Sequence, residues 1–502
     1  MARLLEFPLL VLLSGIVSLA MLVPAAQALV VRDLHEARTF FYGAILFSFL
    51  TILVAIATRD SPIRQPARNQ LLNVLGAFVL IPALAAVPFY EALETEPFLT
   101  AYFEMVSSLT TTGATLFDDP TVLPDSLHLW RALVGWLGGA FLWVSALAIL
   151  APLNLGGFEV GSGSEQQGRF TQISQLTTLS DRLARYGARL LPIYTVLTLV
   201  LWIGLVVVGE TPFVAICHAM AILSTSGISP VGGVANGASG FGGEMLIVLF
   251  FIFALSRQTF STDNLTTYSN RLREDPEFRI GLLIAVSVPM LLFLRHWVGA
   301  FEGDQIENTT GAFRALWGSF FTTISFLTTT GFASEFWGDA QSWSGLQTPG
   351  LILLGLALVG GGVATTAGGV KLLRVYALYK HGRREIDRLV HPSSIAGSGG
   401  DARRIRRQGA YIAWIFFMLF AVSLALIMTL LALTGLDFET ATVLTIAALS
   451  TTGPLATEAA AFPISYAALT QWAQSILIAA MVLGRLETLA IIALLNPDFW
   501  RR

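Results

Sequence analysis

Four short segments of this chain carry the residues that could do chemistry. Each is a run of three hydroxyl-bearing residues closed by a glycine, and the four are Thr110–Gly113, Ser224–Gly227, Thr328–Gly331 and Ser450–Gly453. Their glycines lie about 104 to 122 residues apart. Glycine permits backbone angles that are closed to other residues, so adjacent carbonyl groups can turn toward one axis. Carbonyl and hydroxyl oxygens arranged in this way can replace the water shell of a partly dehydrated cation.

The composition of the segments narrows the kind of ion. None of them contains a carboxylate, which argues against a divalent-selective acidic ring and for a weakly held monovalent ion. One copy would be explained more simply as a helix C-cap or a packing contact, but four equivalent copies favour a shared ion path. The predicted ligands are Thr111, Thr112, Gly113, Thr225, Ser226, Gly227, Thr329, Thr330, Gly331, Thr451, Thr452 and Gly453.

The rest of the chain must hold these segments inside a membrane. Its residues are 54% hydrophobic and 13% charged, which is too apolar for a soluble protein of 502 residues. Continuous apolar runs of about 20 residues favour helices over a β-barrel. The first apolar run is interpreted as a retained helix rather than a cleaved secretory signal.

Ten apolar runs predict ten spanning helices. They are residues 5–30, 39–58, 71–90, 130–152, 188–209, 243–262, 279–299, 346–372, 410–434 and 468–494. Shorter stretches lead into the four segments and predict re-entrant half-helices, at Pro97–Ser108, Thr211–Leu223, Gly311–Leu327 and Phe438–Leu449. The negative dipole ends of such half-helices would favour a cation at the segments.

The predicted fold is therefore an all-α polytopic membrane protein with about ten transmembrane helices. Two N-terminal helices precede four repeats of helix, half-helix (pore helix), polar filter turn and helix, arranged with pseudo-fourfold symmetry. The expected divisions are residues 1–68 for the two N-terminal helices, 69–180 for repeat 1, 181–274 for repeat 2, 275–407 for repeat 3 and 408–502 for repeat 4.

Charge predicts the orientation. Basic residues gather in the connections between repeats, and by the positive-inside rule these connections face the cytoplasm. Acidic residues flank the polar turns on the other side, among them Glu104, Asp118, Asp119, Glu335 and Glu458. These acids either concentrate cations at a pore mouth or remain where basic residues are excluded. Lys371 and Arg374 are expected to be cytoplasmic anchors, with contact to a regulatory ring as the alternative.

Several motifs carry a family resemblance that covers nearly the whole chain. They are Phe103-Glu104 before the first segment, Trp130-Arg131-Ala132 before Trp136-Leu137-Gly138-Gly139, Asp275-Pro276-Glu277-Phe278-Arg279, Leu327 to Ala333, and Gly484-Arg485-Leu486-Glu487 with Asn496 to Trp500. In these motifs the chain resembles the Trk/Ktr/HKT potassium transporter superfamily, most closely its TrkH-type bacterial membrane subunits.

This resemblance implies potassium uptake across the bacterial inner membrane through a single-chain filter that faces the periplasm. Glycine in all four filter positions is the pattern associated with potassium, since members with serine in the first position tend to favour sodium. The family also implies a homodimer and a cytoplasmic nucleotide-binding ring of the TrkA type. No cofactor and no nucleic-acid partner is expected, and the basic stretch from Lys380 to Arg407 is a candidate docking surface for the ring or for lipid.

A glycine-rich run, Gly360 to Gly369, interrupts the predicted helix at 346–372, because five glycines in ten residues oppose a helix. By resemblance it is an intramembrane gate loop below the filter, with gate residues Gly360, Gly361, Gly362, Thr365, Thr366, Gly368 and Gly369. Arg485 is a charge within an apolar run, and such a residue usually faces a cavity or a partner. By the same resemblance it would point into the pore beside this loop, and a pair with Glu487 or another carboxylate is the alternative.

Other function classes fit less well. A sodium-permeable member or a cation-coupled symporter of the same family is an alternative. A membrane enzyme acting on lipid-linked substrates would have only Asp118-Asp119 as a candidate Mg²⁺ pair. The neighbouring Cys217 and His218 point apart on a helix, which makes a metal site there improbable.

Overall fold

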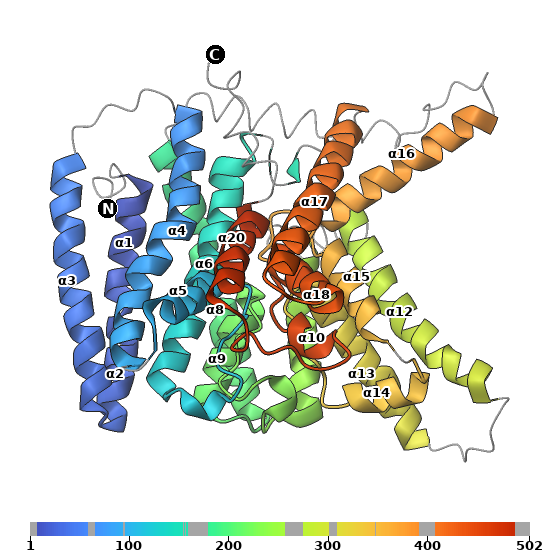
Figure 1. The fold of residues 1–502 in the computed structure, drawn as a ribbon, viewed down its shortest axis with the longest axis horizontal. Coiled ribbons are helices and arrows are strands. Elements are labelled where there is room, and N and C mark those ends of the chain that lie inside the picture. Colours follow the sequence, from blue (N-terminus) through green and yellow to red (C-terminus); the bar gives the residue numbers. More distant parts are fainter. Residues whose placement is uncertain are drawn as a thin grey trace.

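The computed structural model describes residues 8–58, 66–93, 96–153, 155, 157–158, 179–256, 275–300, 309–346, 348–390 and 407–486. These residues form helices joined by turns and loops, as predicted (Figure 1). In the described part, seven helices are long and apolar enough to cross a membrane. Three further predicted spans contain the shorter helices α10 (Gly240–Leu255), α15 (Gly350–Val359) and α20 (Gln471–Leu486).

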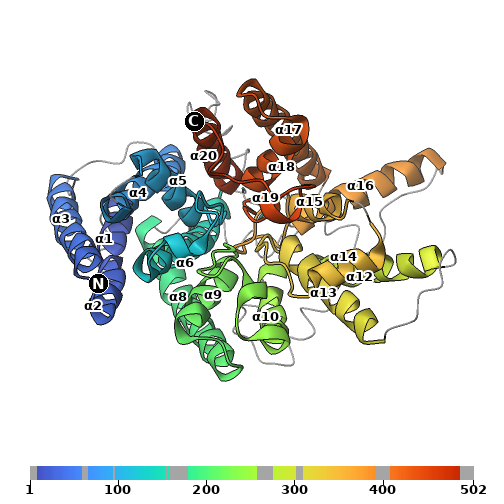
Figure 2. The same cartoon turned by 60° about the horizontal axis from the view of Figure 1, so that its bottom comes forward.

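The N-terminal helices lie to one side of the molecule (Figure 2). Helices α1 (Leu9–Ala20) and α2 (Leu22–Val31) follow one another almost without a break, and α3 (Leu34–Thr58) returns along both of them. The turn is made at Arg32, whose φ of 66° places it in the left-handed region. Most of the apolar side chains of α3 are exposed, as expected for a helix that faces lipid.

Four helical units follow. The first contains α4 (Pro66–Leu93), α5 (Phe98–Leu109) and α6 (Asp125–Ser145), the last continued by a π turn at Ala146–Leu150. The second contains α8 (Leu179–Val207), α9 (Pro212–Ser224) and α10. The third contains α12 (Pro276–Ala300), α13 (Thr309–Leu327), α14 (Trp337–Ser344), α15 and α16 (Leu372–Val390). The fourth contains α17 (Arg407–Leu433), α18 (Phe438–Leu449), α19 (Leu455–Glu458) and α20.

The four half-helices are present close to their predicted positions, as α5, α9, α13 and α18. Each packs against its own unit and against the closing helix of the unit before it. Thus α9 contacts α6, α13 contacts α10, α18 contacts α15, and α5 contacts α20. The last contact joins the fourth unit to the first, so the units close into a ring (Figure 2). This cyclic order confirms the predicted fourfold architecture.

The predicted helix at 346–372 is broken where its glycines lie. Helix α15 ends at Val359, and α16 begins at Leu372. Gly360 and Gly369 have φ values of 72° and 76°, in the left-handed region where glycine is favoured. Helix α16 then runs away from the ring (Figures 1 and 2).

Candidate ion filter and gate

Each half-helix ends in the same backbone turn. In the first unit the Thr112 N–H donates to the Ser107 carbonyl at 2.8 Å, and the Thr111 N–H donates to the Ser108 carbonyl at 2.9 Å. The same pair of bonds ends the other three half-helices, donated by Thr225 and Ser226, by Thr329 and Thr330, and by Thr451 and Thr452. This is the Schellman arrangement, which requires a left-handed residue just after the helix. In its backbone geometry each of the four segments is therefore a helix C-cap, as the simpler explanation predicted.

The left-handed residue in every turn is a threonine. Thr111, Thr225, Thr329 and Thr451 have φ values of 53°, 53°, 57° and 54°. The left-handed conformation costs an L-residue roughly 1–2 kcal/mol, and a β-branched residue in it is a genuine outlier. Such strain persists only where the surroundings enforce it, and it clusters at functional sites. Four equal outliers indicate that a threonine side chain is needed here.

The hydroxyl groups of the four segments fall into two sets. The first and third residues of each run bond to each other, as in Thr110 with Thr112 at 2.8 Å and Ser224 with Ser226 at 3.0 Å. The third and fourth runs repeat this pair at 3.1 and 3.2 Å. These side chains brace the turn, so ion ligands from the third residues would be their backbone carbonyls, of which the Thr112 carbonyl also accepts from the Gly453 N–H.

The middle threonines form the second set. Their side chains are all buried. Among the described residues, the hydroxyls of Thr111 and Thr451 have no hydrogen-bond partner. A buried polar oxygen without a partner is costly and calls for an explanation. A cation that passes these oxygens would provide one. The described residues include no group of three His, Cys, Asp or Glu side chains that could hold a metal ion.

The segments touch one another around the ring. A methyl group added to Gly113 would overlap the carbonyl oxygen of Ser226, and one on Gly227 would overlap the carbonyl oxygen of Thr330. A methyl on Gly453 would overlap the backbone of Ala114. The structure therefore brings all twelve predicted filter residues together, in the cyclic order of the units.

The fourth segment departs from the other three. Gly113, Gly227 and Gly331 have positive φ values, whereas Gly453 does not. The Gly453 N–H donates to the Thr112 carbonyl at 2.6 Å, and its own carbonyl accepts from the Tyr466 hydroxyl at 3.0 Å. Next to it, the Pro454 ring packs against Gly227 and Gly331. The four copies are thus not equivalent in backbone geometry.

A cavity of about 420 Å³, here called the vestibule, is lined by filter glycines and by residues that follow them in the chain. Its lining includes Gly113, Gly227, Gly453, Asp118, Arg131 and Tyr466. Glu104 was expected among the acidic residues at the pore mouth. It instead lies on the half-helix α5 and has no exposed surface. Its carboxylate is paired with the Arg131 guanidinium, Nε to Oε2, at 2.8 Å. The vestibule is therefore less uniformly acidic than the sequence suggests.

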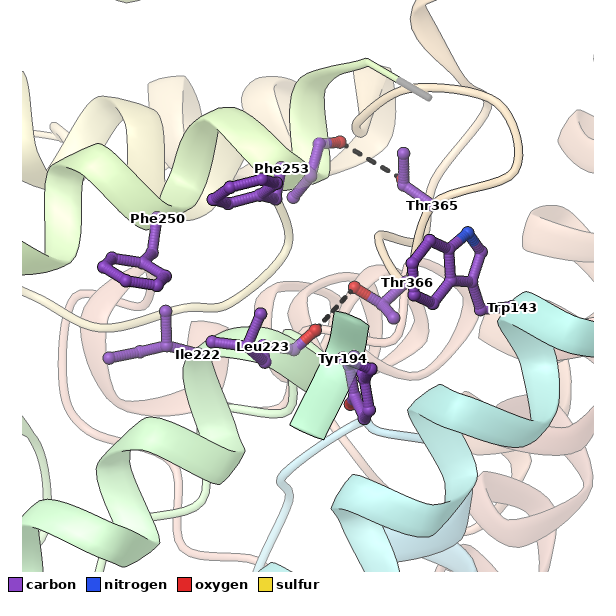
Figure 3. Close-up of a pocket in the computed structure, with 9 residues that line it drawn as sticks. Trp143, Tyr194, Ile222, Leu223, Phe250, Phe253, Thr365 and Thr366 are labelled. Carbon is purple, nitrogen blue, oxygen red and sulfur yellow. Dashed lines mark hydrogen bonds between the residues drawn. The ribbon is translucent and has the colours of Figure 1, made fainter. Parts of the chain in front are cut away.

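The glycine-rich loop at 360–371 contacts the third and fourth filter segments and the end of the half-helix that leads into the second. The Thr366 hydroxyl donates to the Leu223 carbonyl at 3.1 Å, just before the second segment (Figure 3). The Gly368 N–H donates to the Thr329 hydroxyl at 2.7 Å in the third. A methyl on Gly368 would overlap Ser450 and Thr451 in the fourth. Of the predicted gate residues, Gly368 thus meets the filter directly, and Thr366 meets the half-helix end next to it.

Neighbouring helices fix the other side of this loop. The Thr365 hydroxyl and the Gly362 N–H both donate to the Ala254 carbonyl, at 3.1 and 3.0 Å (Figure 3). The Val363 N–H donates to the Glu277 carboxylate of α12 at 2.9 Å. The small cavity drawn in Figure 3 lies between the loop and helices α6, α8, α9 and α10.

Three basic residues lie near the gate. Arg485 is buried, with 4% of its surface exposed, and it interacts electrostatically with Tyr194 beside the cavity of Figure 3. Lys371 and Arg374 are buried too, so the expectation that they are cytoplasmic anchors was wrong. The Lys371 ammonium donates to the Ala367 carbonyl in the loop, and the Arg374 guanidinium lies 3.7 Å from the Phe416 ring centroid. Lys371 thus braces the junction between the loop and α16, and Arg374 packs α16 against α17.

Several residues around the site escaped the sequence prediction. Glu244 of α10 accepts hydrogen bonds from Trp317, Ser334 and the Glu335 N–H, all within 2.8 Å. Tyr466 lies in a loop without a motif, and only the fold brings it to Gly453. Glu277 belongs to a motif that carries the family resemblance, but the sequence predicted no function for it. Residues 391–406 of the docking stretch predicted from Lys380 to Arg407 lie outside the described residues, as does the C-terminal motif from Asn496.

Comparison with known proteins agrees with this architecture. The family model described as "TrkH: Cation transport protein" matches residues 36–233 and 243–500. The Trk system potassium uptake protein TrkH of Vibrio parahaemolyticus is 30% identical over 504 residues, covering 98% of each chain. TrkH of Escherichia coli K12 is 28% identical, covering 98% of this chain and 97% of the relative.

A solved structure shares the whole fold. The crystal structure of the potassium transporter TrkH from Vibrio parahaemolyticus superimposes with a TM-score of 0.83 at 25% sequence identity. The superposition covers 99% of this chain and 100% of the other. These relatives are named for potassium uptake and not for an enzymatic activity, which removes the lipid-enzyme alternative. From the ring of half-helices, the matched sequence and the shared fold, we conclude that the chain belongs to the TrkH family of cation transport proteins.

Proposed function

We propose that this protein takes up potassium through the ring of four filter turns, under the control of the loop at 360–371. The observation that carries the proposal is the fourfold repeat of a strained threonine in one backbone turn, closed into a ring. Hydroxyls that lack partners in the described structure, at Thr111 and Thr451, suit a cation that passes through. The potassium uptake named for the relatives supports the choice of ion.

In this proposal the loop closes the path just below the filter. It is bonded to Leu223, at the end of the half-helix before the second segment, and to Thr329 in the third, and it packs against the fourth, so the conducting state requires these contacts to break. The positive charge of Arg485 would limit cation flow near the loop. Because Glu277 and Ala254 hold the loop from the neighbouring helices, a shift of α12 or α10 could release it.

We further propose that the protein lies in a bacterial inner membrane with its filter toward the periplasm. The basic connections between repeats support this orientation. A homodimer and a cytoplasmic nucleotide-binding ring of the TrkA type are the partners that the family resemblance implies. Helix α16 begins at the gate loop and contains the first part of the basic stretch, residues 380–390. This helix would therefore connect such a ring directly to the gate.

Potassium uptake can be tested in a bacterium that lacks its own potassium uptake systems, with the TrkA-type partner of the source genome co-expressed. The intact protein is expected to restore growth at low potassium and to take up ⁸⁶Rb⁺. The Gly113→Ser variant should lower the ratio of potassium to sodium uptake about tenfold or more. Its side chain would overlap the Ser226 carbonyl, at a φ of 73° that disfavours serine.

The control is Gly338→Ser, because a side chain at Gly338 of α14 would meet open space. This variant should keep the wild-type ratio. Failure of the intact protein to move potassium or rubidium would contradict the proposal. Equal uptake of sodium and potassium by the intact protein would instead favour the sodium-permeable alternative.

A further inference from the structure

One position in the half-helices supports the outer side of the filter. Nine residues before the filter glycine, the four units carry Glu104, His218, Thr322 and Leu444. In three units this side chain bonds to the chain just after the filter glycine. The His218 ring nitrogen lies 2.8 Å from the Ser229 hydroxyl, and the Thr322 hydroxyl accepts from the Ser334 N–H at 3.2 Å. Leu444 in the fourth unit has no polar atom to offer.

Glu104 makes the strongest of these contacts. Its Oε1 accepts from the Leu116 N–H at 2.6 Å and from the Thr115 hydroxyl at 2.9 Å. Its other oxygen faces the Arg131 guanidinium at 2.8 Å. Arg131 comes from α6 and also lines the outer cavity. One buried carboxylate therefore ties the half-helix, the segment after Gly113 and the vestibule wall together.

Burial makes these contacts strong. Glu104 has no exposed surface and Arg131 only 4%. Hydrogen bonds to a charged acceptor are about twice as strong as those between neutral groups. A filter discriminates between ions through the placement of its oxygens. A support that holds Thr115 and Leu116, two and three residues after Gly113, can therefore influence selectivity without touching the ion.

We propose that Glu104 is a positioning residue for ion selection. Its carboxylate oxygen fixes Thr115 and Leu116 and thereby the Gly113 carbonyl, while Arg131 holds the carboxylate in place. This inference rests on the proposed potassium function and adds a residue outside the filter to it. The corresponding contacts of His218 and Thr322 support the second and third segments, and the fourth relies on the Tyr466 hydroxyl at Gly453.

The test compares two double variants that both remove the ion pair. Glu104→Gln with Arg131→Gln keeps an oxygen that can accept from Thr115 and Leu116 and replaces the ion pair by an amide pair. Glu104→Leu with Arg131→Leu leaves no acceptor. Replacement of a buried ion pair by apolar residues of similar volume is often neutral for folding, so the second variant is expected to fold. Leucine also occurs naturally at the corresponding position in the fourth unit.

Purified proteins in liposomes are assayed for ⁸⁶Rb⁺ and ²²Na⁺ uptake, normalised to monodisperse protein. The amide variant should keep the Rb⁺/Na⁺ ratio within about twofold of wild type. The apolar variant should lose about tenfold, the factor that corresponds to one charge-assisted hydrogen bond. A support that matters only for folding would lower both fluxes in parallel and leave the ratio unchanged.

Two results would overturn the inference. One is an apolar variant that is folded and has the wild-type ratio, which would make Glu104 a structural residue only. The other is equal loss of the ratio in both variants, which would assign the effect to charge rather than to the hydrogen bonds. Wild-type protein that moves neither Rb⁺ nor K⁺ would instead contradict the proposed function, and the inference with it.

Discussion

At the scale of single residues, the middle threonine of each filter turn combines two demands. The turn needs a left-handed residue, for which glycine is the usual choice. The chain places threonine there four times and keeps glycine for a position two residues later. The hydroxyl is thus kept at a cost in backbone strain. The four hydroxyls differ in their partners. Of the four, only the Thr329 hydroxyl accepts a hydrogen bond from the gate loop.

This asymmetry leads to a prediction for Thr329→Val. Valine keeps the branched shape but cannot accept from the Gly368 N–H. A buried N–H without a partner costs about 1–3 kcal/mol, and this cost falls on the arrangement in which the loop is docked. Rubidium flux through the variant in liposomes, in the absence of any partner protein, should therefore rise about tenfold.

Thr225→Val is the matched control for this prediction. Thr225 holds the corresponding place in the second unit, but its hydroxyl donates to the adjacent Ser224 carbonyl and not to the loop. Its flux should not rise. If Thr329→Val lowers flux to the same degree as Thr225→Val, the hydrogen bond to Gly368 does not hold the gate.

At the scale of elements, the half-helices were predictable because their signals are local. An apolar stretch too short to span a membrane, followed by hydroxyls and glycine, predicted α5 and α9 to within about one residue at each end. The break after Val359 followed from glycine content in the same way. The burial of Glu104 and of Lys371 was not predictable, since charge patterns along the sequence do not reveal a partner that only packing supplies. Arg131 and the Ala367 carbonyl are such partners.

A loop on the filter side of the membrane illustrates how one carboxylate joins two elements. Glu210, between α8 and α9, accepts from the Ala238 N–H at 3.1 Å and from the Ser239 hydroxyl at 2.9 Å. Burial opposes its ionisation, but the hydrogen bonds from Ala238 and Ser239 outweigh this and hold the pKa of Glu210 below its usual value. The ionised carboxylate therefore stabilises the folded loop.

The sign of the pH dependence follows from this lowered pKa. The stabilisation is fully present above the pKa of an unfolded glutamate, about 4.3, and is lost as the pH falls through the lower folded value. Glu210→Gln should therefore lower the midpoint of thermal unfolding in detergent at pH 7. The difference in midpoint between the variant and the wild type, called the gap, should narrow below about pH 4. Glu91→Gln, at an exposed position near the end of α4, should show no such gap. A gap that is constant from pH 7 to pH 3 would contradict this reasoning.

At the scale of the whole molecule, a single chain builds a fourfold ring whose quarters need not be equal. A true tetramer would repeat any change four times, whereas here Glu104, His218, Thr322 and Leu444 have diverged at one position. The gate loop exists in the third unit and reaches across to the second and fourth. The sequence repeat predicted the ring but not these differences, because Tyr466 and Pro454 reach the filter through loops whose course has no periodic signal.

The orientation of the whole molecule can be tested with its cysteine content. The chain has one cysteine, Cys217, which is fully buried. Cys217→Ser therefore gives a background to which single cysteines can be added. Phe462, in the loop between α19 and α20 on the filter side, is 84% exposed, and Leu389, near the distant end of α16, is 81% exposed.

In intact cells, a membrane-impermeant maleimide should label the Phe462→Cys protein, because the filter is expected to face the periplasm. The Leu389→Cys protein should be labelled only after the inner membrane is permeabilised, because α16 follows the gate loop on the side of the basic connections. Restored potassium uptake by each variant would establish that the labelled protein is functional. The reverse pattern of labelling would place the filter on the cytoplasmic side, and the positive-inside argument would then fail for this chain.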